Sequence, residues 1–323
     1  TASRVALGSL VTASGVSAAS DGSFAFLGAE RERPDEVYLW PAGADAPVRL
    51  TDHNAFLASL PAPRTVGLEW RTPDGFQTDG VVTYPPGFDP AKRHPLVLYI
   101  HGGPTAASNE GFSSRVHMLA ARGWIVFQPN YRGSDNRGSA FQRAIAADPG
   151  PGIDRDVMSG IRALVRQGGV DTTRIGVSGW SFGGYVTAWL IGHHRHWKAA
   201  IVGAGAMDLF DMYALTDLNV QIRHAITTSP YVGNREAWFR QQSPLTYASR
   251  VRTPTLILHD VRDQRVTITQ SYKLYHALKD NDVPVQFIAY PVAGHSPTDP
   301  VRSRDVHRRW LDWFDKHFGS VVP

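Results

Sequence analysis

A serine between two glycines is the best candidate for covalent chemistry in this chain. The segment Gly179-Trp180-Ser181-Phe182-Gly183 follows a short apolar run and precedes a stretch rich in small residues. A tight turn between a strand and a helix exposes such a serine hydroxyl, and the glycines leave room for closely packed backbone. We therefore interpret Ser181 as a candidate nucleophile rather than as part of a structural turn.

A serine hydroxyl is a weak nucleophile at neutral pH, so the site also needs a histidine base and a carboxylate that orients it. In this type of strand–turn–helix site, the acid and then the histidine follow the serine along the chain. His295 is the candidate base, because it lies in a glycine-flanked loop after the last apolar run. Asp260 and Asp263 compete for the role of the acid. Loop length favours Asp263, but spacing alone leaves both open.

Acyl transfer further requires N–H donors for the negative charge that develops on the substrate oxygen. The backbone N–H of Phe182 qualifies, because Phe182 directly follows the nucleophile. The segment His101-Gly102-Gly103-Pro104 follows another apolar run, and its backbone could approach a substrate carbonyl closely. The alternative for this segment is a simple turn.

The order of elements around these residues indicates an α/β fold with a doubly wound, mostly parallel sheet. Short apolar runs predict six buried strands, and stretches with helical spacing alternate with them. In such sheets, ligands bind beyond the carboxyl ends of the strands, where the candidate residues lie. The runs are 95–100, 124–127, 175–178, 199–202, 255–258 and 285–290, and the helical stretches are 154–167, 184–192, 269–280 and 301–318.

The first 60 residues have a different pattern. Alternating apolar residues at 24–27 and 36–40, with turn signals between them, predict short antiparallel strands. The proline-rich segment 60–63 predicts a linker, so we expect one unit at residues 1–64 and an α/β domain at 65–323. A hairpin or two cannot bury a core alone. We therefore expect the first unit to pack on the rest of the chain or on other strands.

Composition excludes several classes of protein. The 323 residues are 42% hydrophobic and contain no cysteine, which argues against disorder, disulfides and thiolate metal sites. The formal net charge of +4 is scattered, so a nucleic-acid partner is not expected. No apolar stretch approaches the roughly 18 residues of a membrane span. We expect a soluble protein. Residues 3–20 show no signal peptide, and the compartment, cytoplasmic or secreted, stays open.

Together, these motifs resemble the prolyl oligopeptidase family of serine peptidases, especially its acylaminoacyl-peptidase and dipeptidyl-peptidase-like branches. The resemblance covers about residues 65–320 and implies an α/β-hydrolase fold. It is carried by His101-Gly102-Gly103-Pro104, Asn130-Tyr131-Arg132-Gly133-Ser134, Gly179-Trp180-Ser181-Phe182-Gly183-Gly184-Tyr185, Asp263-x-Arg265-Val266 and Gly294-His295.

The resemblance implies a role for each candidate residue. Ser181, Asp263 and His295 would form a catalytic triad, and the backbone amides of Gly103 and Phe182 would form the oxyanion hole. Neither a metal nor an organic cofactor would be needed.

Four further residues receive substrate-binding roles from the same resemblance. Arg265 would bind the carbonyl of the second residue before the scissile bond, and a surface ion pair is the alternative for it. Val266, Phe210 and Tyr213 would form walls of the pocket for the residue at the scissile bond.

Members of this family carry a β-propeller before the hydrolase domain, and residues 1–64 resemble its closing blade. We therefore expect either a partner chain that carries the other blades, or a short relative with an open site. The exposed strand edges of such a segment also predict self-association.

The resulting hypothesis is a serine peptidase that cleaves amide bonds of short peptides. A carboxylesterase with the same triad is the first alternative, and a non-catalytic hydrolase-fold binding module is the second. The histidine cluster at 193–196 is interpreted as a solvated helix end rather than a metal site, because it lacks a second cluster of ligands.

Overall fold

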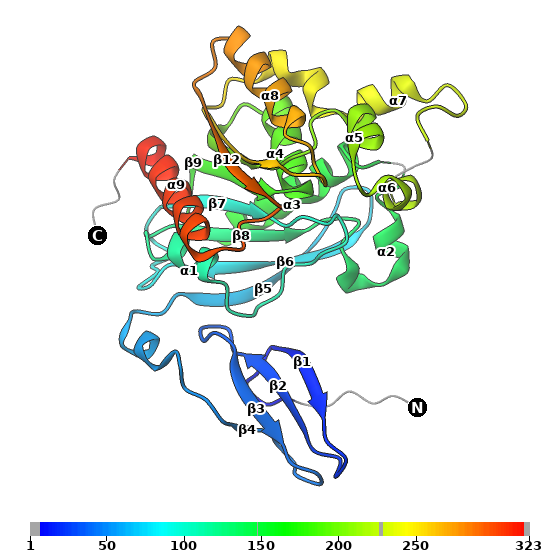
Figure 1. Cartoon of the computed structure of the whole chain (residues 1–323). Coiled ribbons are helices and arrows are strands. Elements are labelled where there is room, and N and C mark those ends of the chain that lie inside the picture. Colours follow the sequence, from blue (N-terminus) through cyan, green and yellow to red (C-terminus); the bar gives the residue numbers. More distant parts are fainter. Residues whose placement is uncertain (1–6, 147, 226–228, 320–323) are drawn as a thin grey trace.

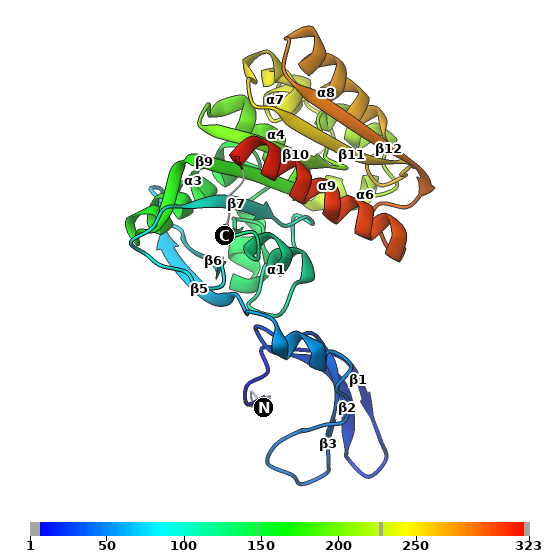
Figure 2. The same cartoon turned by 90° about the vertical axis from the view of Figure 1, so that its left-hand side faces the viewer.

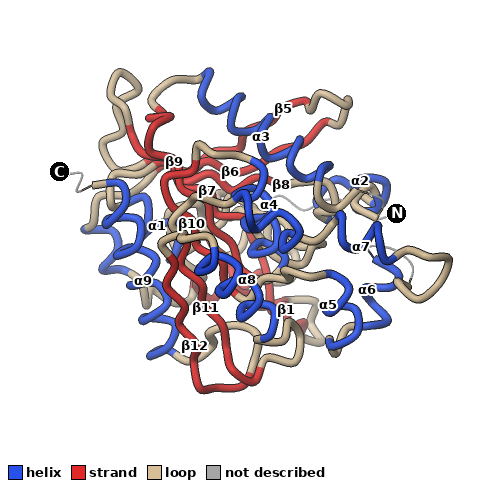
Figure 3. Tube along the Cα trace, turned by 90° about the horizontal axis from the view of Figure 1, so that it is seen from above, coloured by secondary structure: helices blue, strands red, loops and turns tan. Residues whose placement is uncertain are grey.

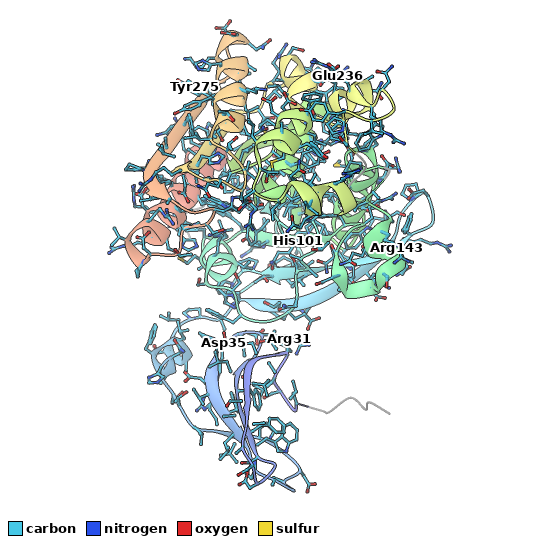
Figure 4. The ribbon with its side chains drawn as sticks, turned by 45° about the vertical axis from the view of Figure 1, so that its right-hand side comes forward. Arg31, Asp35, His101, Arg143, Glu236 and Tyr275 are labelled. Carbon is cyan, nitrogen blue, oxygen red and sulfur yellow. The ribbon has the colours of Figure 1, made fainter. Side chains whose placement is uncertain are left out.

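The computed structural model describes residues 7–146, 148–225 and 229–319, which form two β-sheets (Figure 1). The sheets lie apart from each other in two perpendicular views (Figure 2). Arg31 lies where they approach each other, and its guanidinium pairs with Glu110 of the larger unit (Figure 4). The amide of Phe112 also donates to the carbonyl oxygen of Glu30 at 3.1 Å. The junction between the two units is therefore largely polar.

The smaller sheet is an antiparallel meander of the strands β1 (Thr12–Ala18), β2 (Phe24–Ala29), β3 (Glu36–Trp40) and β4 (Val48–Arg49). Its core is small and centres on Leu10, Phe26 and Trp40. Val16 and Val48 stay 64% and 55% exposed. A sheet of this size buries little apolar surface, as the sequence pattern predicts. A short 3-10 helix, η1 (Ala55–Ser59), leads from it to the larger sheet.

The larger sheet has eight strands in the order β12-β11-β10-β9-β7-β8-β6-β5. β5 and β6 form an antiparallel hairpin, β6 is antiparallel to β8, and the remaining pairs are parallel. The expected α/β-hydrolase fold is therefore confirmed. The strands are β5 (Arg64–Arg71), β6 (Gln77–Tyr84), β7 (His94–Ile100), β8 (Ile125–Asn130), β9 (Val170–Trp180), β10 (Trp197–Gly203), β11 (Thr255–Arg262) and β12 (Val285–Ala293).

Helices cover both faces of this sheet because successive strand residues point to opposite sides. In β7, Leu96 and Leu98 belong to the core beneath α3 (Pro151–Arg166), α4 (Phe182–His193) and α8 (Thr269–Asp280). Val97 belongs to the core beneath α1 (Ser114–Ala120) and α9 (Pro300–Phe318). Viewed from above, the two groups of helices lie on opposite sides of the strands (Figure 3). None of the helices in the described residues combines the length and apolar character that a bilayer crossing requires.

Between β10 and β11 the chain leaves the sheet and forms several short helices above its carboxyl edge (Figure 1). The periodicity of the sequence did not indicate them, because helices of six or seven residues show too few turns for a pattern. They are α5 (Leu209–Leu215), α6 (Asn219–Ala225), α7 (Glu236–Gln241) and the 3-10 helix η3 (Pro244–Arg250). A second small group, η2 (Asp135–Arg137) and α2 (Ser139–Arg143), follows β8.

The run at 285–290 is not a buried strand, so that prediction was wrong. β12 forms the edge of the sheet and pairs only with β11, and none of its residues is fully buried. One side of β12 packs on α8 through Phe287, whose ring lies 5.5 Å from that of Tyr272. The residue pattern indicates that this run is apolar. Whether the strand lies at the edge of the sheet depends on the topology of the whole sheet.

Candidate active site

Ser181 occupies a strained turn between β9 and α4. Its φ of 60° and ψ of −123° lie outside the regions that a serine ordinarily adopts. The turn brings Gly183 so close to the end of β7 that an added Cβ would lie 2.1 Å from the carbonyl oxygen of Ile100. The glycine is therefore required by contact with another strand, and the strained backbone presents the serine side chain at the carboxyl edge of the sheet.

The three residues proposed as a triad lie in one hydrogen-bonded chain. Ser181 Oγ lies 2.7 Å from His295 Nε2, and His295 Nδ1 lies 2.6 Å from Asp263 Oδ2. Each residue follows a different strand, namely β9, β11 and β12. With a proton on Nδ1, the imidazole donates to the carboxylate and can accept the serine proton through Nε2. The arrangement can therefore generate an alkoxide nucleophile.

The carboxylate of Asp263 is buried and accepts several hydrogen bonds. Its Oδ1 accepts from the backbone N–H groups of Arg265 at 2.8 Å and Val266 at 3.1 Å. Burial raises the pKa of Asp263, but hydrogen bonds from His259 and His295 outweigh this effect and lower the pKa to about 2. The carboxylate is therefore ionised at neutral pH, as a group that orients an imidazolium must be.

Asp260, the alternative acid, lies in β11 and does not reach His295. Its side chain is fully buried, and burial raises its pKa. Neither carboxylate oxygen makes a hydrogen bond within the described residues, and the nearest charge is Arg302 Nη1 at 3.2 Å from Oδ1. Of the two candidates, Asp263 alone contacts the histidine.

The glycine-rich segment after β7 lies directly against the serine turn. A Cβ added at Gly102 would lie 3.2 Å from Ser181 Cβ and 3.8 Å from the backbone nitrogen of Phe182. Gly103 and Phe182 both line the cavity next to Ser181. The structure thus brings together the two residues whose amides were expected to bind an oxyanion.

The rings of His101 and Tyr131 pack against each other next to this glycine-rich segment. The ring of His101 stacks on Tyr131 with centroids 4.3 Å apart, and the Tyr131 hydroxyl donates to the carbonyl oxygen of His101 at 2.9 Å. His101 lies in the larger unit (Figure 4), and desolvation of its partly buried ring lowers its pKa to about 4. The segment 130–134, noticed in the sequence for its resemblance alone, therefore holds the glycine-rich segment in place.

A cavity of about 580 Å³ opens beside Ser181 and reaches beneath the short helices. Most of its inner wall is apolar, and α5, α6, α7 and the turn after β11 contribute to it. Val266 lines the cavity, as the resemblance implied. Further apolar side chains of this wall include Ala206, Leu209, Met212, Leu218, Ile222 and Phe239.

Phe210 and Tyr213 do not line this cavity. Both lie on α5, but Leu209 and Met212, three residues apart, occupy the helix face that looks into the cavity. Phe210 and Tyr213 lie one position further along and pack against Tyr231, with ring centroids 5.3 and 6.1 Å away. The resemblance indicated α5, which does line the cavity. Which face of α5 meets the cavity follows from the packing of the helix.

Arg265 lies at the rim of the cavity and forms an ion pair with Asp217. Its Nε and Nη2 lie 2.8 and 3.2 Å from the two oxygens of the Asp217 carboxylate. Both side chains are about two-fifths exposed, at 43% and 41%. Arg265 therefore lines the cavity and also forms the surface ion pair that was the alternative for it.

Two contacts that the sequence analysis missed hold the His295 loop. The indole N–H of Trp180 donates to the carbonyl oxygen of His295 at 2.6 Å, and Arg302 Nη2 donates to that of Ser296 at 2.7 Å. Trp180 lies within the serine motif, yet its position there carried no signal of this role. Arg302 lies in a helix whose spacing indicated only packing.

The histidine cluster at the end of α4 forms local contacts. His194 Nε2 lies 2.8 Å from Asp154 Oδ1, and His193 Nδ1 lies 2.8 Å from the carbonyl oxygen of Trp189. In the part of the chain that the structure describes, no three His, Asp or Glu side chains gather as metal ligands. The cluster is part of the packing around α4.

Comparison with known proteins agrees with this geometry. A family model described as the prolyl oligopeptidase family matches residues 110–321. The chain is 30% identical over 295 residues to the uncharacterized peptidase YuxL of Bacillus subtilis, covering 88% of this chain and 44% of that protein. It is 29% identical over 293 residues to dipeptidyl-peptidase 5 of Porphyromonas gingivalis, covering 88% and 42%.

A solved structure extends the similarity to the fold. Acylaminoacyl peptidase of Pyrococcus horikoshii superposes with a TM-score of 0.89 at 25% identity, covering 99% of this chain and 51% of that chain. The present chain spans less than half the length of either curated relative. The family match extends over more than half of the residues and includes the serine turn, Asp263 and His295. The chain belongs to the prolyl oligopeptidase family.

Proposed function

We propose that this chain is the catalytic part of a serine peptidase that cleaves amide bonds of short peptides through an acyl-enzyme on Ser181. The observation that carries the proposal is the continuous hydrogen-bonded chain from Ser181 through His295 to Asp263 at the mouth of an apolar cavity. The similarity to a dipeptidyl-peptidase and an acylaminoacyl peptidase favours amide bonds over esters.

In this proposal, Ser181 Oγ attacks the carbonyl carbon of the scissile bond while its proton moves to His295 Nε2. The carbonyl oxygen becomes negatively charged and accepts hydrogen bonds from the amides of Gly103 and Phe182. Collapse of this intermediate breaks the C–N bond, and His295 returns the proton to the leaving amine. Water then attacks the ester in the same way and releases the acid. Asp263 stays ionised throughout and keeps the imidazole oriented.

The cavity supports an apolar side chain at the residue whose carbonyl is attacked. Its wall of Leu209, Met212, Phe239 and Val266 offers no charge to such a side chain. Arg265, at the rim, would bind the carbonyl of the preceding residue, and its ion pair with Asp217 keeps the guanidinium near the cavity. A charged side chain in the cavity would lose its hydration without a partner, so basic and acidic residues should be poor substrates there.

The test uses a p-nitroanilide and a p-nitrophenyl ester that share one apolar acyl group. We expect Ser181→Ala to lower amide turnover by about 10⁴-fold or more, because the nucleophile is lost. Ser159→Ala is the matched control, since Ser159 is a buried serine whose hydroxyl bonds only the carbonyl oxygen of Asp156. Turnover of the ester alone would indicate a carboxylesterase, and no Ser181-dependent turnover of either would indicate a binding module.

For partners, we propose that the smaller sheet joins further β-strands, either in a propeller-bearing chain or in a second copy. Its first and last strands, β1 and β4, each pair on one side only. Val16, Val48 and Leu50 add more than half-exposed apolar side chains there. Light scattering of the isolated chain should therefore show a mass above 35.5 kDa. A monodisperse monomer would contradict self-association.

A further inference from the structure

The carboxylate of Asp263 has a second imidazole beside it. His259 lies in β11, four residues before Asp263, and is fully buried. Its Nε2 lies 3.3 Å from Asp263 Oδ2, the same oxygen that lies 2.6 Å from His295 Nδ1. Thirteen histidines occur in the chain, and the sequence analysis did not single this one out. The carboxylate oxygen thus lies between two rings.

The neighbours of His259 determine which ring nitrogen carries the proton. Nε2 lies 2.7 Å from the carbonyl oxygen of Val266, and a carbonyl oxygen can only accept. Nε2 therefore carries a hydrogen, which it donates to the Val266 carbonyl, and Asp263 Oδ2 lies 3.3 Å from the same nitrogen. With the hydrogen on Nε2, Nδ1 can accept from the hydroxyl of Ser271 on α8, whose Oγ lies 2.7 Å away. Ser271 is itself buried.

The same turn carries both the acid and part of the cavity wall. The Val266 amide donates to Asp263 Oδ1, the Val266 carbonyl accepts from His259, and the Val266 side chain lines the cavity. The backbone from Asp263 to Val266 is therefore held to the sheet and to α8 through one imidazole. A shift of this turn would move the acid away from His295.

We infer that His259 is a positioning residue for the proposed reaction: its Nε2–H and its bond to Ser271 hold the Asp263 carboxylate so that Oδ2 faces His295. The expected loss of kcat rests on the proposed function, whereas the expected change in the His295–Asp263 hydrogen bond rests on the geometry alone. His259 contacts neither the substrate cavity nor Ser181. It acts through the turn that carries Asp263, as groups behind a ligand or catalytic residue commonly do.

The test compares His259→Leu with His259→Gln on the peptide p-nitroanilide. Leucine removes the donor, so kcat should fall by about 10- to 100-fold while KM stays within about 3-fold. Glutamine offers an amide N–H in place of Nε2–H and should restore kcat to within about 5-fold of wild type. Ser271→Ala should lower kcat by less than the leucine variant, because the imidazole remains.

Two controls separate positioning from a general structural loss. His94→Leu removes a histidine whose nitrogens lie near the backbone oxygens of Gly123 and Asp89, at the amino end of β7 and so away from the triad. It should lower the melting temperature without changing kcat at temperatures where the protein is folded. Ser159→Ala is the control for Ser271→Ala.

A spectroscopic measurement tests the geometry without any turnover. A proton shared between an imidazole Nδ1 and a carboxylate resonates far downfield in the proton NMR spectrum, so the His295–Asp263 bond has its own signal. We expect this signal to weaken or move in His259→Leu and Ser271→Ala, and to persist in His259→Gln and His94→Leu. If the wild type shows no Ser181-dependent turnover, the proposed function fails while this signal still tests the role of His259.

Three results would overturn the inference. The first is a His259→Leu protein with unchanged kcat and an unchanged downfield signal. The second is an equal loss of kcat in His259→Leu and His259→Gln, which would mean that the donor is irrelevant. The third applies if His259→Leu does not fold. It is a Ser271→Ala protein whose kcat and downfield signal are both the same as in wild type.

Discussion

Two aspartates three residues apart differ in the hydrogen bonds that their carboxylates accept and in the direction in which their pKa values shift. Asp263 accepts hydrogen bonds on both oxygens, and its pKa falls to about 2. Asp260 is equally buried, accepts none within the described residues, and has a raised pKa because burial outweighs Arg302. At the residue scale, the number of donors around each carboxylate decides which one can stabilise a charged imidazole.

The first prediction compares the two aspartates directly. Asp263→Asn should lower kcat by about 10⁴-fold, because the amide favours the wrong tautomer of His295. Asp260→Asn should leave kcat within about 10-fold of wild type, since Asp260 does not contact the histidine. Steady-state kinetics on the peptide p-nitroanilide measures both. A larger loss in Asp260→Asn than in Asp263→Asn would refute the assignment of the acid.

The second prediction concerns the pH dependence of stability. The pKa of Asp263 lies near 2 in the folded protein against 3.8 ordinarily. Above about pH 4 the ionised carboxylate therefore stabilises the fold by roughly 2 kcal/mol. Between about pH 4 and pH 2 the unfolded chain binds the proton first, so this contribution is lost as the pH falls.

Urea unfolding of wild type and Asp263→Asn across this range checks that sign. The difference in free energy of unfolding between the two proteins should shrink as the pH falls. Asp260→Asn is the matched control, because the raised pKa of Asp260 makes its ionised form destabilising, so its trend should have the opposite sign and should lie above about pH 4. A constant difference for Asp263→Asn from pH 7 to pH 2 would contradict the prediction.

At the element scale, helix α9 connects the His295 loop to the sheet. Its residue Arg302 lies 3.2 Å from the carboxylate of Asp260 in β11 and donates to the carbonyl oxygen of Ser296 in the loop. Asp299 begins the helix by accepting from the Arg302 amide at 2.8 Å. The loop is therefore held at two adjacent carbonyl groups, by Trp180 of the serine turn at His295 and by α9 at Ser296.

The third prediction follows from the burial of this ion pair. Arg302→Met should destabilise the protein by about 3–5 kcal/mol, because it leaves Asp260 buried without a counter-charge. The double variant Asp260→Asn with Arg302→Met should recover a large part of that loss. Arg308→Met, on the exposed side of the same helix, should cost much less, because its ion pairs are solvated. Denaturant unfolding measures all three, and equal losses in Arg302→Met and Arg308→Met would contradict the prediction.

At the scale of the whole molecule, the two sheets have separate cores. The smaller core centres on Leu10, Phe26 and Trp40, and none of these residues belongs to the clusters of the larger sheet. The contacts between the units are mainly polar, such as the pair between Arg31 and Glu110. We therefore propose that residues 1–64 and 65–323 are two units, and that the second folds without the first.

The fourth prediction tests this division with a chain that begins at Pro61. Because β5 starts at Arg64, this truncation leaves the eight-stranded sheet intact. It should unfold in a single cooperative transition and retain activity on small p-nitroanilides within about 5-fold. A truncated chain that is insoluble or unfolded by circular dichroism would show that the smaller sheet is part of the same folding unit.

Much of this protein followed from its sequence, because the relevant signals are local. The serine turn, the apolar strands and the helices at 269–280 and 300–318 are each marked by the residue types within a few positions. The order of the motifs along the chain predicted the α/β-hydrolase fold. It also indicated Ser181 and His295 before any geometry was known.

Tertiary structure decided what depends on contacts between distant segments. Spacing alone left two candidate acids open, the resemblance favoured Asp263, and only the fold shows which carboxylate reaches His295. Periodicity indicates which residues are apolar, but it does not show which helix face meets the cavity or which strand lies at the edge of the sheet. The bond from Trp180 to His295 joins residues 115 positions apart. Such contacts arise only when the chain has closed those long loops, so no local pattern encodes them.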